Sequence, residues 1–433
     1  MMNIKKMFLK YASLSMMSMI GMSCYILADT LFIANGVGPL GLTSLNLVLP
    51  IYNLIFGIGL MLGVGGATRF SILQSQNKNE GEHYFSQTLS IAIFISIPFI
   101  ILGLCFPEKV VSWMGGNQEV MPIAAEYLRT FIIFTPFFIG NYIVVTFVRN
   151  DHDPTLASIA MLAGTLFNIV FDYVFIFPCH LGMFGAALAT GCSPILSILI
   201  CSFHFRKRDN HLKFIRQNLN YHDLFETIQV GIPSFVSELS SGIVTYVFNM
   251  VVFRLGGNIA IASYGIICNL AIVVISLYNG IAQGIQPLMS QCFGRRDLRS
   301  IQQYLHYAII FSLIISCLIY GFVYLCPDMI ISFFNNEGNL QMIEIAKTGL
   351  IIYFSGFFFA GMNMIYVSYF TSIQEVKSSF LISILRGGLI IIPLVFLLSI
   401  FYSLIGVWLS YPVSECFVFI CIVIFMKHKQ SIN

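Results

Sequence analysis

The sequence has 433 residues, of which 58% are hydrophobic and 9% are charged, whereas a soluble domain carries about 25% charged residues. A water-soluble fold of this size cannot cover its surface with so few charges, which excludes a soluble enzyme, a nucleic-acid-binding protein and a disordered scaffold. The net charge of +3 is too small to indicate an anionic partner.

The apolar residues fall into runs of about 20 residues or more, the length that crosses about 30 Å of hydrocarbon as a helix. A backbone in lipid must satisfy its own hydrogen bonds, so each run is predicted to be a membrane-spanning α-helix. The first run contains Asp29 and no small-residue cleavage site, which predicts a retained helix and not a signal peptide. The twelve predicted spans are 8–34, 44–68, 86–106, 127–148, 156–177, 183–204, 230–254, 262–290, 303–326, 347–370, 378–401 and 406–426.

The basic residues between these runs indicate an orientation. With the N-terminus inside, the inner segments hold seventeen Lys and Arg, among them Lys78, Arg149, Arg216 and Lys429, and the outer segments hold four. Arg386, inside a helix, completes the 22. Because cytoplasmic loops are enriched in Lys and Arg, both termini are predicted to be cytoplasmic.

The chain divides into two halves that resemble each other. A basic stretch from Arg206 follows the sixth run, so residues 1–205 are predicted to form an N-lobe, 206–228 a cytoplasmic linker and 229–433 a C-lobe. FTPFF at 134–138 aligns with FSGFF at 354–358, and GAALAT at 185–190 with GVWLS at 406–410. Each half also has a long segment between its third and fourth runs. Repeated halves with a site between them are typical of secondary transporters. The sequence contains no phosphate-binding loop of the G-x-x-x-x-G-K-[S/T] type, so nothing in it indicates that nucleotide hydrolysis drives transport.

Ionisable residues inside a membrane are costly and mark candidate functional sites. Asp29, Asp172 and Thr190 lie at similar depths, about 7–11 Å below the outer end of their helices at 1.5 Å per residue. Asn168 lies one turn deeper than Asp172 on the same helix face. This oxygen-rich set predicts a site for a proton or a small hard cation, against the alternative that both aspartates merely cap helix ends.

Three further charges lie within the C-terminal runs. Arg386 and Glu415 are at similar depths in the last two helices, which predicts a structural ion pair. Glu238, near the middle of the seventh helix, is either a protonated core acid or a second ligand site facing the cavity. None of the eleven cysteines forms a C-x-x-C pair, so they are expected to act as small hydrophobic residues and not as metal ligands.

Several motifs together resemble the multidrug and toxic compound extrusion (MATE) family. They are DTLFIA at 29–34, NIVFDYVFIF at 168–177, GMFGAALAT at 182–190, QGIQPLMS at 283–290, FGR at 293–295, and Arg386 followed by IP at 392–393, GVW at 406–408 and PVSE at 412–415. The resemblance implies an all-α integral membrane fold of twelve helices in two six-helix lobes around a central cavity. The resemblance also implies a cation site at Asp29, Asn168, Asp172 and Thr190. These are the same four residues that the comparison of depths in the membrane indicates. Some relatives instead use a pair of acids in the C-lobe, a helix-7 glutamate that Glu238 matches and a helix-10 aspartate, but the tenth predicted helix has no acid here.

These observations predict a secondary antiporter of a prokaryotic inner membrane that exports cationic or amphipathic drugs in exchange for protons. Sodium is the competing coupling ion at the same four residues. A monomer among membrane lipids is expected, with no nucleic-acid partner and no cofactor beyond the coupling ion. The first alternative is a flippase of lipid-linked precursors, which would need a basic central cavity for pyrophosphate, whereas Arg386 is the one cation predicted inside a helix. The second, a membrane-embedded enzyme, would need a reactive cluster within the helices.

Overall fold

The computed structural model describes residues 4–76, 81–215, 220–332 and 339–432, and every regular element within these ranges is helical. Lys78 and Arg216 lie outside the described residues, as does the side chain of Lys429. The first half of the chain comprises α1 Ile4–Gly36, α2 Pro39–Ser75, α3 Gly81–Cys105, α4 Pro107–Trp113, α5 Met121–Ile133, α6 Thr135–Asn150, α7 Pro154–Ile176, α8 Gly182–Cys201 and the 3-10 turn η1 Ser202–Arg206. The second half comprises α9 Tyr221–Gly294, α10 Leu298–Leu325, α11 Pro327–Ser332, α12 Leu340–Phe354, α13 Phe357–Ser372, α14 Val376–Ile384, the π-helical turn η2 Leu385–Leu389 and α15 Ile391–Ile432.

Two of these helices are each two membrane crossings joined by a sharp turn. A straight helix of the 74 residues of α9 would be about 110 Å long, several times the thickness of a bilayer. Its backbone reverses at Gly257, at φ 60° and ψ −151°, and the rings of Phe248 and Tyr264 stack 5.6 Å apart across the turn. Ser403 breaks α15 in the same way, at φ 52° and ψ −133°.

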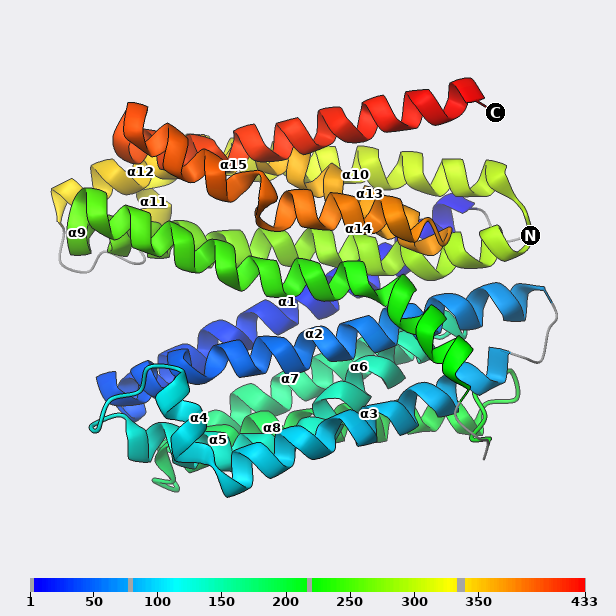
Figure 1. The fold of residues 1–433 in the computed structure, drawn as a ribbon, viewed down its shortest axis with the longest axis horizontal. Helices are drawn as coiled ribbons and strands as arrows, with labels where there is room; N and C mark the ends of the chain where they lie inside the picture. Colours follow the sequence, from blue (N-terminus) through cyan, green and yellow to red (C-terminus); the bar gives the residue numbers. More distant parts are fainter. Residues whose placement is uncertain (1–3, 77–80, 216–219, 333–338, 433) are drawn as a thin grey trace.

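The number of crossings follows once the bent helices are assigned. Eight described segments are long and apolar enough to span a membrane, and two bent pairs, α5 with α6 and α12 with α13, qualify as broken spans. Counting the reversals within α9 and within Val376–Lys427 as hairpins gives twelve crossings, as the sequence predicts. The described residues therefore form an all-α bundle of two six-helix lobes, which lie side by side in Figure 1.

The sequence repeat coincides with a structural repeat. The α5–α6 pair bends by 48° at Phe134, and the α12–α13 pair bends by 43° directly after Phe354. Each half also inserts a short helix, α4 or α11, before its bent pair. Gly185 and Gly406 lie near the start of the last crossing of each half, where an added Cβ would collide with the end of the preceding crossing.

Each half of the chain contains its own large hydrophobic core. Buried residues from Ile33 to Leu212 form one cluster, and buried residues from Phe248 to Tyr411 form the other. The first half of α1 is an exception, because Phe8 and Tyr11 belong to the second cluster. Helix α1 therefore begins against the C-terminal lobe and ends within the N-terminal lobe.

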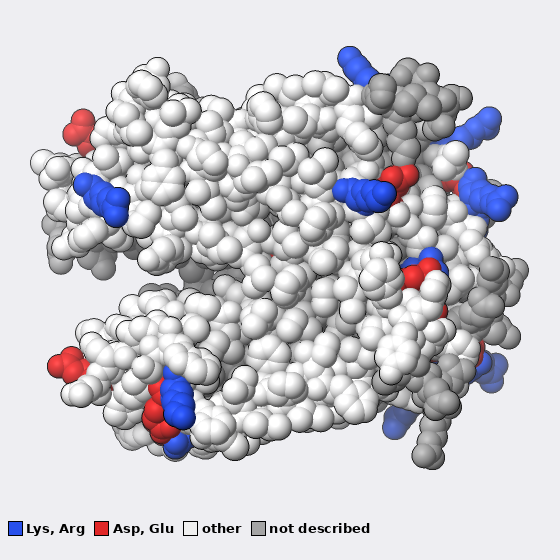
Figure 2. Space-filling view, viewed as in Figure 1, with Lys and Arg blue, Asp and Glu red and all other residues white. Residues whose placement is uncertain are grey.

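The two lobes separate at one end of the molecule and meet at the other. Figure 2 shows a hollow between them at the end remote from the chain termini, which lie together at the opposite end in Figure 1. Close backbone contact closes this terminal end: a Cβ on Gly231 would lie 1.9 Å from the Met61 carbonyl oxygen, and one on Gly65 2.0 Å from that of Thr227. Most Lys and Arg visible in Figure 2 lie toward the terminal end.

Candidate functional site

The carboxyl groups of Asp29 and Asp172 lie against each other inside the N-terminal lobe. Asp29 is on α1 and Asp172 on α7, with 8% and 0% of their surfaces exposed. No described residue donates a hydrogen bond to Asp29 Oδ1 or to either oxygen of Asp172. Two buried carboxyls at contact distance repel each other when both are ionised. The arrangement therefore favours one shared proton, or a cation held between the two groups.

Asn168 and Thr190 extend this site by one turn. Asn168 lies four residues before Asp172 on the same face of α7, and its Nδ2 donates a hydrogen bond of 3.3 Å to Thr190 Oγ1 on α8. The Oδ1 atom of Asn168 is buried and has no partner among the described residues. The structure thus brings together all four residues that the sequence selects for the cation site, with neutral oxygens beside the carboxyl pair.

The cation site is surrounded by three tyrosines that were not predicted from the sequence. The hydroxyls of Tyr25 and Tyr52 lie 2.7 Å apart, with Tyr25 one turn before Asp29 on α1. Tyr127, on α5, is buried beside both aspartates and contacts Thr190. The four-residue spacing of Tyr25 and Asp29 could have revealed the first of them, whereas no sequence signal points to Tyr127.

Glu238 lies where the lobes meet and does not join the carboxyl pair. On α9, its Cβ is 3.7 Å from the position that a side chain on Gly57 of α2 would occupy. Tyr52 and Tyr142 of the N-terminal lobe are close enough to interact electrostatically with its carboxyl group.

The structure brings Arg386 and Glu415 together in the C-terminal lobe. Arg386 Nε and Nη2 each lie 3.0 Å from a carboxylate oxygen of Glu415. Asn363 on α13 donates to Glu415 Oε2 at 2.7 Å and to its backbone oxygen at 2.9 Å. Arg386 belongs to the π-helical turn η2, where the extra residue in the turn displaces the backbone from a regular helix. No motif or spacing in the sequence predicts the role of Asn363.

One correction concerns Arg149, which the sequence analysis assigned to an inner loop while treating Arg386 as the one cation within a helix. Arg149 lies in the last turn of α6 and is 1% exposed. Its Nη1 donates a hydrogen bond of 2.8 Å to Gln283 Oε1 on α9, across the lobe boundary. The predicted fourth span ends at residue 148 because a hydropathy pattern treats any arginine as exposed. It cannot show that Arg149 is buried by a hydrogen bond to a glutamine far away in the sequence.

Arg149 begins a buried polar network that joins the lobes at the terminal end. Asn150 accepts a hydrogen bond from Ser71 at 2.7 Å and donates to Gln286 at 3.0 Å. Gln286 in turn donates to Thr68 at 2.7 Å, and Gln291 donates to the Asn150 carbonyl oxygen at 3.1 Å. Opening the terminal end would break the hydrogen bonds of Gln286 and Gln291, which join the two lobes.

The segment that links the lobes is anchored to the N-terminal lobe beside this network. Asp151 is buried and accepts hydrogen bonds from His204 Nε2 at 2.8 Å and from the backbone of His211 at 2.8 Å. Burial alone would raise the pKa of Asp151, but these hydrogen bonds, and one from the His211 ring, lower the pKa below its usual value. Asp153 contacts both His204 and Lys207.

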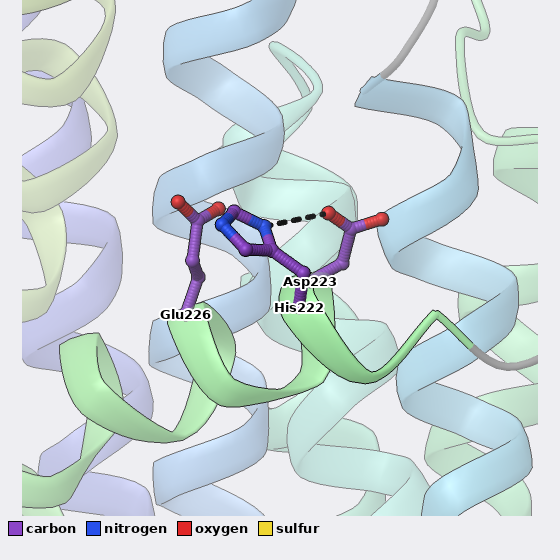
Figure 3. A group of neighbouring side chains, drawn as sticks. All are labelled: His222, Asp223 and Glu226. Atoms are coloured by element: carbon purple, nitrogen blue, oxygen red, sulfur yellow. Dashed lines mark ion pairs between the residues drawn. The ribbon is translucent and has the colours of Figure 1, made fainter.

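A second anchor lies at the start of α9, drawn in Figure 3. His222, Asp223 and Glu226 are close enough to share a metal ion, but Glu226 already forms an ion pair with Arg69 and accepts a hydrogen bond of 2.8 Å from Tyr84. His222 Nδ1 is 3.8 Å from Asp223, and its side chain is largely exposed. Arg69 supplies the positive charge beside Glu226 that a metal would otherwise provide, so the cluster ties α9 to the N-terminal lobe.

Two repeated lobes of membrane-spanning helices, with a cleft between them and a buried acidic site inside one, define a secondary transporter. The MatE family model matches residues 15–174 and 233–397. The chain therefore belongs to the MATE family of multidrug efflux transporters and is not an enzyme.

Curated relatives and solved structures agree with this assignment. The chain is 26% identical over 386 residues to the multidrug export protein MepA of Staphylococcus saprophyticus, covering 86% of this chain and 82% of the relative. It is 26% identical over 388 residues to MepA of Staphylococcus aureus strain MRSA252, with the same coverage. A crystal structure of MATE in complex with MaL6 shares the fold at a TM-score of 0.93 and 22% identity, covering 99% of this chain and 97% of that one. An outward-facing structure of a multidrug resistance MATE family transporter matches at a TM-score of 0.93 and 22% identity. That match covers 99% of this chain and 96% of the other.

Proposed function

We propose that the protein is an antiporter that exports cationic, amphipathic compounds in exchange for protons, by alternately opening the cleft between its lobes to the two sides of the membrane. The observation that carries the proposal is the Asp29–Asp172 pair, whose buried oxygens receive no hydrogen bond from any described residue. A shared proton satisfies this pair, and a cationic compound or rehydration of the site would displace it. The MepA relatives, named as multidrug export proteins, support the substrate class.

Sodium is the second coupling ion that the site could accept. Asn168 and Thr190 add neutral oxygens of the type that a hard cation coordinates, and a proton does not need them. The contact between the two carboxyl groups favours the proton, because a shared hydrogen bond removes their repulsion directly. We propose that Asp29, Asn168, Asp172 and Thr190 bind the coupling ion, with Glu238 as an additional acid at the lobe boundary.

The structure reveals a second buried cation, Arg149, but the described residues do not form the basic cavity that a flippase of lipid-linked precursors would need. Arg149 is packed into the closed terminal end, and Arg386 is paired with Glu415. A pyrophosphate group would need several unpaired cations converging on the cleft. We infer that organic cations are the substrates of this chain.

We further propose that the chain is a monomer in the inner membrane of a prokaryote, surrounded by lipid, with both termini in the cytoplasm. The cleft would then face outward, since it opens at the end remote from the termini. An impermeant thiol reagent applied to intact cells should label a single-cysteine variant retaining Cys179, which is exposed between α7 and α8. The same reagent should not label a cysteine introduced at Asn210, and labelling there would reverse the orientation.

Transport in liposomes tests the coupling proposal. Purified protein should move a fluorescent organic cation when a pH gradient is imposed without sodium, and both Asp29→Asn and Asp172→Asn should abolish this movement. Each amide keeps the shape of the side chain and removes its charge. Full transport by both variants would refute the site, and transport driven by a sodium gradient but not by a pH gradient would refute the proton assignment.

A further inference from the structure

A cavity inside the N-terminal lobe continues from the proposed cation site toward the terminal end. Its volume of about 50 Å³ accommodates a few water molecules, and it lies among α1, α2, α6, α7 and α8. Asn168 and Thr190 line one part of it, and Met161 and Ser197 line another. Between these pairs α7 and α8 stay close: Ser193 Oγ donates a hydrogen bond of 2.9 Å to the Gly164 carbonyl oxygen.

The lining of this cavity contains polar atoms that have no protein partner. Asn141 Oδ1, Asn168 Oδ1 and Ser197 Oγ are buried and accept or donate no hydrogen bond among the described residues. Asn168 and Ser197 are 1% and 2% exposed as residues. A cavity with space for a few water molecules and several unsatisfied polar atoms is the kind that holds ordered water, whereas a purely apolar one stays empty. The cavity therefore has the chemistry of a hydrated passage that starts beside the carboxyl pair.

Arg149 lies at the terminal end of this passage. Its Nη2 contacts the Met161 sulfur at 3.5 Å, and its Nε has no acceptor among the described residues. No described carboxylate forms an ion pair with it. The buried guanidinium is instead held by Gln283 of the other lobe, and by the negative end of the α6 dipole, since Arg149 lies in the last turn of α6. Ser158, with a buried unpartnered hydroxyl, follows one turn beyond Met161 on α7.

We propose that this cavity is the water-filled route by which the coupling proton leaves the Asp29–Asp172 pair toward the terminal end, and that Arg149 closes the route while Gln283 holds it. This inference rests on the proposed function. The proton passes from a carboxyl group to the water chain and then to bulk solvent, so no other reactant is needed. The fixed positive charge repels cations at the exit, as a buried arginine does in other selective pores.

The contact between Arg149 and Gln283 links the route to the movement of the lobes. While the lobes meet at the terminal end, Gln283 keeps the guanidinium between the cavity and the solvent. When they part, Gln283 withdraws with α9, and the unpaired guanidinium gains by moving into water. Proton release is then confined to the state in which the cleft faces the terminal side, which prevents a continuous proton leak.

Proton flux into liposomes without any substrate tests this role. Under an imposed membrane potential, Arg149→Ala should raise proton influx severalfold over the wild type, and the exposed control Arg208→Ala at the same end should not. Adding Asp172→Asn to Arg149→Ala should remove the increase, because the pair is the entry to the route. Gln283→Leu, which leaves Arg149 in place without its partner, should give a smaller increase and serves if Arg149→Ala does not fold.

A second variant blocks the passage instead of opening it. Ser197→Leu should abolish pH-driven efflux while leaving binding of the fluorescent cation and the melting temperature unchanged, and Ser202→Leu, at the exposed end of α8, should transport normally. Wild-type proton influx in both Arg149→Ala and Gln283→Leu, or wild-type efflux in Ser197→Leu, would overturn the route. If Asp172→Asn alone leaves efflux intact, the proposed function fails. If it abolishes efflux while the route variants behave as wild type, the route alone fails.

Discussion

Asp172 in the N-terminal lobe and Glu415 in the C-terminal lobe are both carboxyl groups buried in the helix bundle, yet their surroundings differ. Glu415 receives hydrogen bonds from Arg386 and Asn363 on its side-chain oxygens. Asp172 faces a second carboxyl group, and its oxygens receive no hydrogen bond from the described residues. Since a buried charge is stable only when it is paired, the first arrangement is complete within the protein, and the second needs a proton or cation from outside.

This difference shows how a repeated fold can separate stability from coupling. The two lobes share bends, short inserted helices and a tight last hairpin, and these shared backbone features do not distinguish the two acids. The distinction lies in which side chains meet the buried acids. We infer that the C-terminal acid fixes the packing of α13, η2 and α15, while the N-terminal acids bind the coupling ion.

The largest expected effect follows from replacing the N-terminal acids. Asp29→Asn and Asp172→Asn should each eliminate pH-driven efflux, because an amide cannot take up and release the proton. Both variants should remain folded, with melting temperatures at or above that of the wild type, since each removes an unsatisfied buried carboxyl. Thermal unfolding and transport measured on the same preparations check this. A large loss of stability would show that these acids have a structural role like that of Glu415.

Removing one partner of the C-terminal pair should mainly destabilise the protein. Arg386→Ala leaves Glu415 buried without its cation, at a cost of about 3–5 kcal/mol in the free energy of unfolding. The double variant with Glu415→Ala should lose less than the sum of the single variants, because the uncompensated charge disappears. A double-mutant cycle based on unfolding gives the coupling energy. Strictly additive losses would exclude a stabilising pair.

The polar network at the terminal end should contribute less to the free energy of unfolding than the Arg386–Glu415 pair does. Its loss should affect the conformational equilibrium of the lobes more than folding. Gln286→Leu removes the acceptor of Asn150 and the donor to Thr68, each buried, at about 1–3 kcal/mol. The loss should shift the protein toward the state that is open at the terminal end. Spin labels at Arg208 and Arg296, one exposed position on each side, should show a longer mean distance in this variant. An unchanged distance would mean that backbone contacts at Gly65 and Gly231 close this end unaided.

The smallest expected effect concerns acidity at the linker anchor. The pKa of Asp151 is lower in the folded protein than in the unfolded chain, where it is about 3.9. Its contribution to stability is therefore complete above the unfolded pKa and is lost as the pH falls through the folded pKa. The melting temperature of the wild type should fall on acidification below about pH 4, and that of Asp151→Asn should fall less. Identical pH profiles would show that other acids dominate.

Helical spacing and depth were sufficient to select Asp29, Asn168, Asp172 and Thr190, because residues one turn apart share a face and membrane thickness limits the register of neighbouring helices. The same reasoning brought Arg386 and Glu415 together. It could not anticipate Tyr127, Asn363 or the burial of Arg149, since each depends on contacts between helices distant in the sequence. The lobe boundary inside α1 is also invisible in hydropathy, because residues 8–34 form one continuous apolar run.

The central claim, that the Asp29–Asp172 pair holds one exchangeable proton, can be tested by measuring proton release directly. Purified protein in weakly buffered detergent solution is mixed with a saturating organic cation, and the released protons are counted with a pH-sensitive dye. We expect the wild type to release about one proton per molecule between pH 6 and 8, independently of sodium, and Asp172→Asn to release none while still binding the cation. Equal release by the wild type and Asp172→Asn, or no release by either, would contradict the claim.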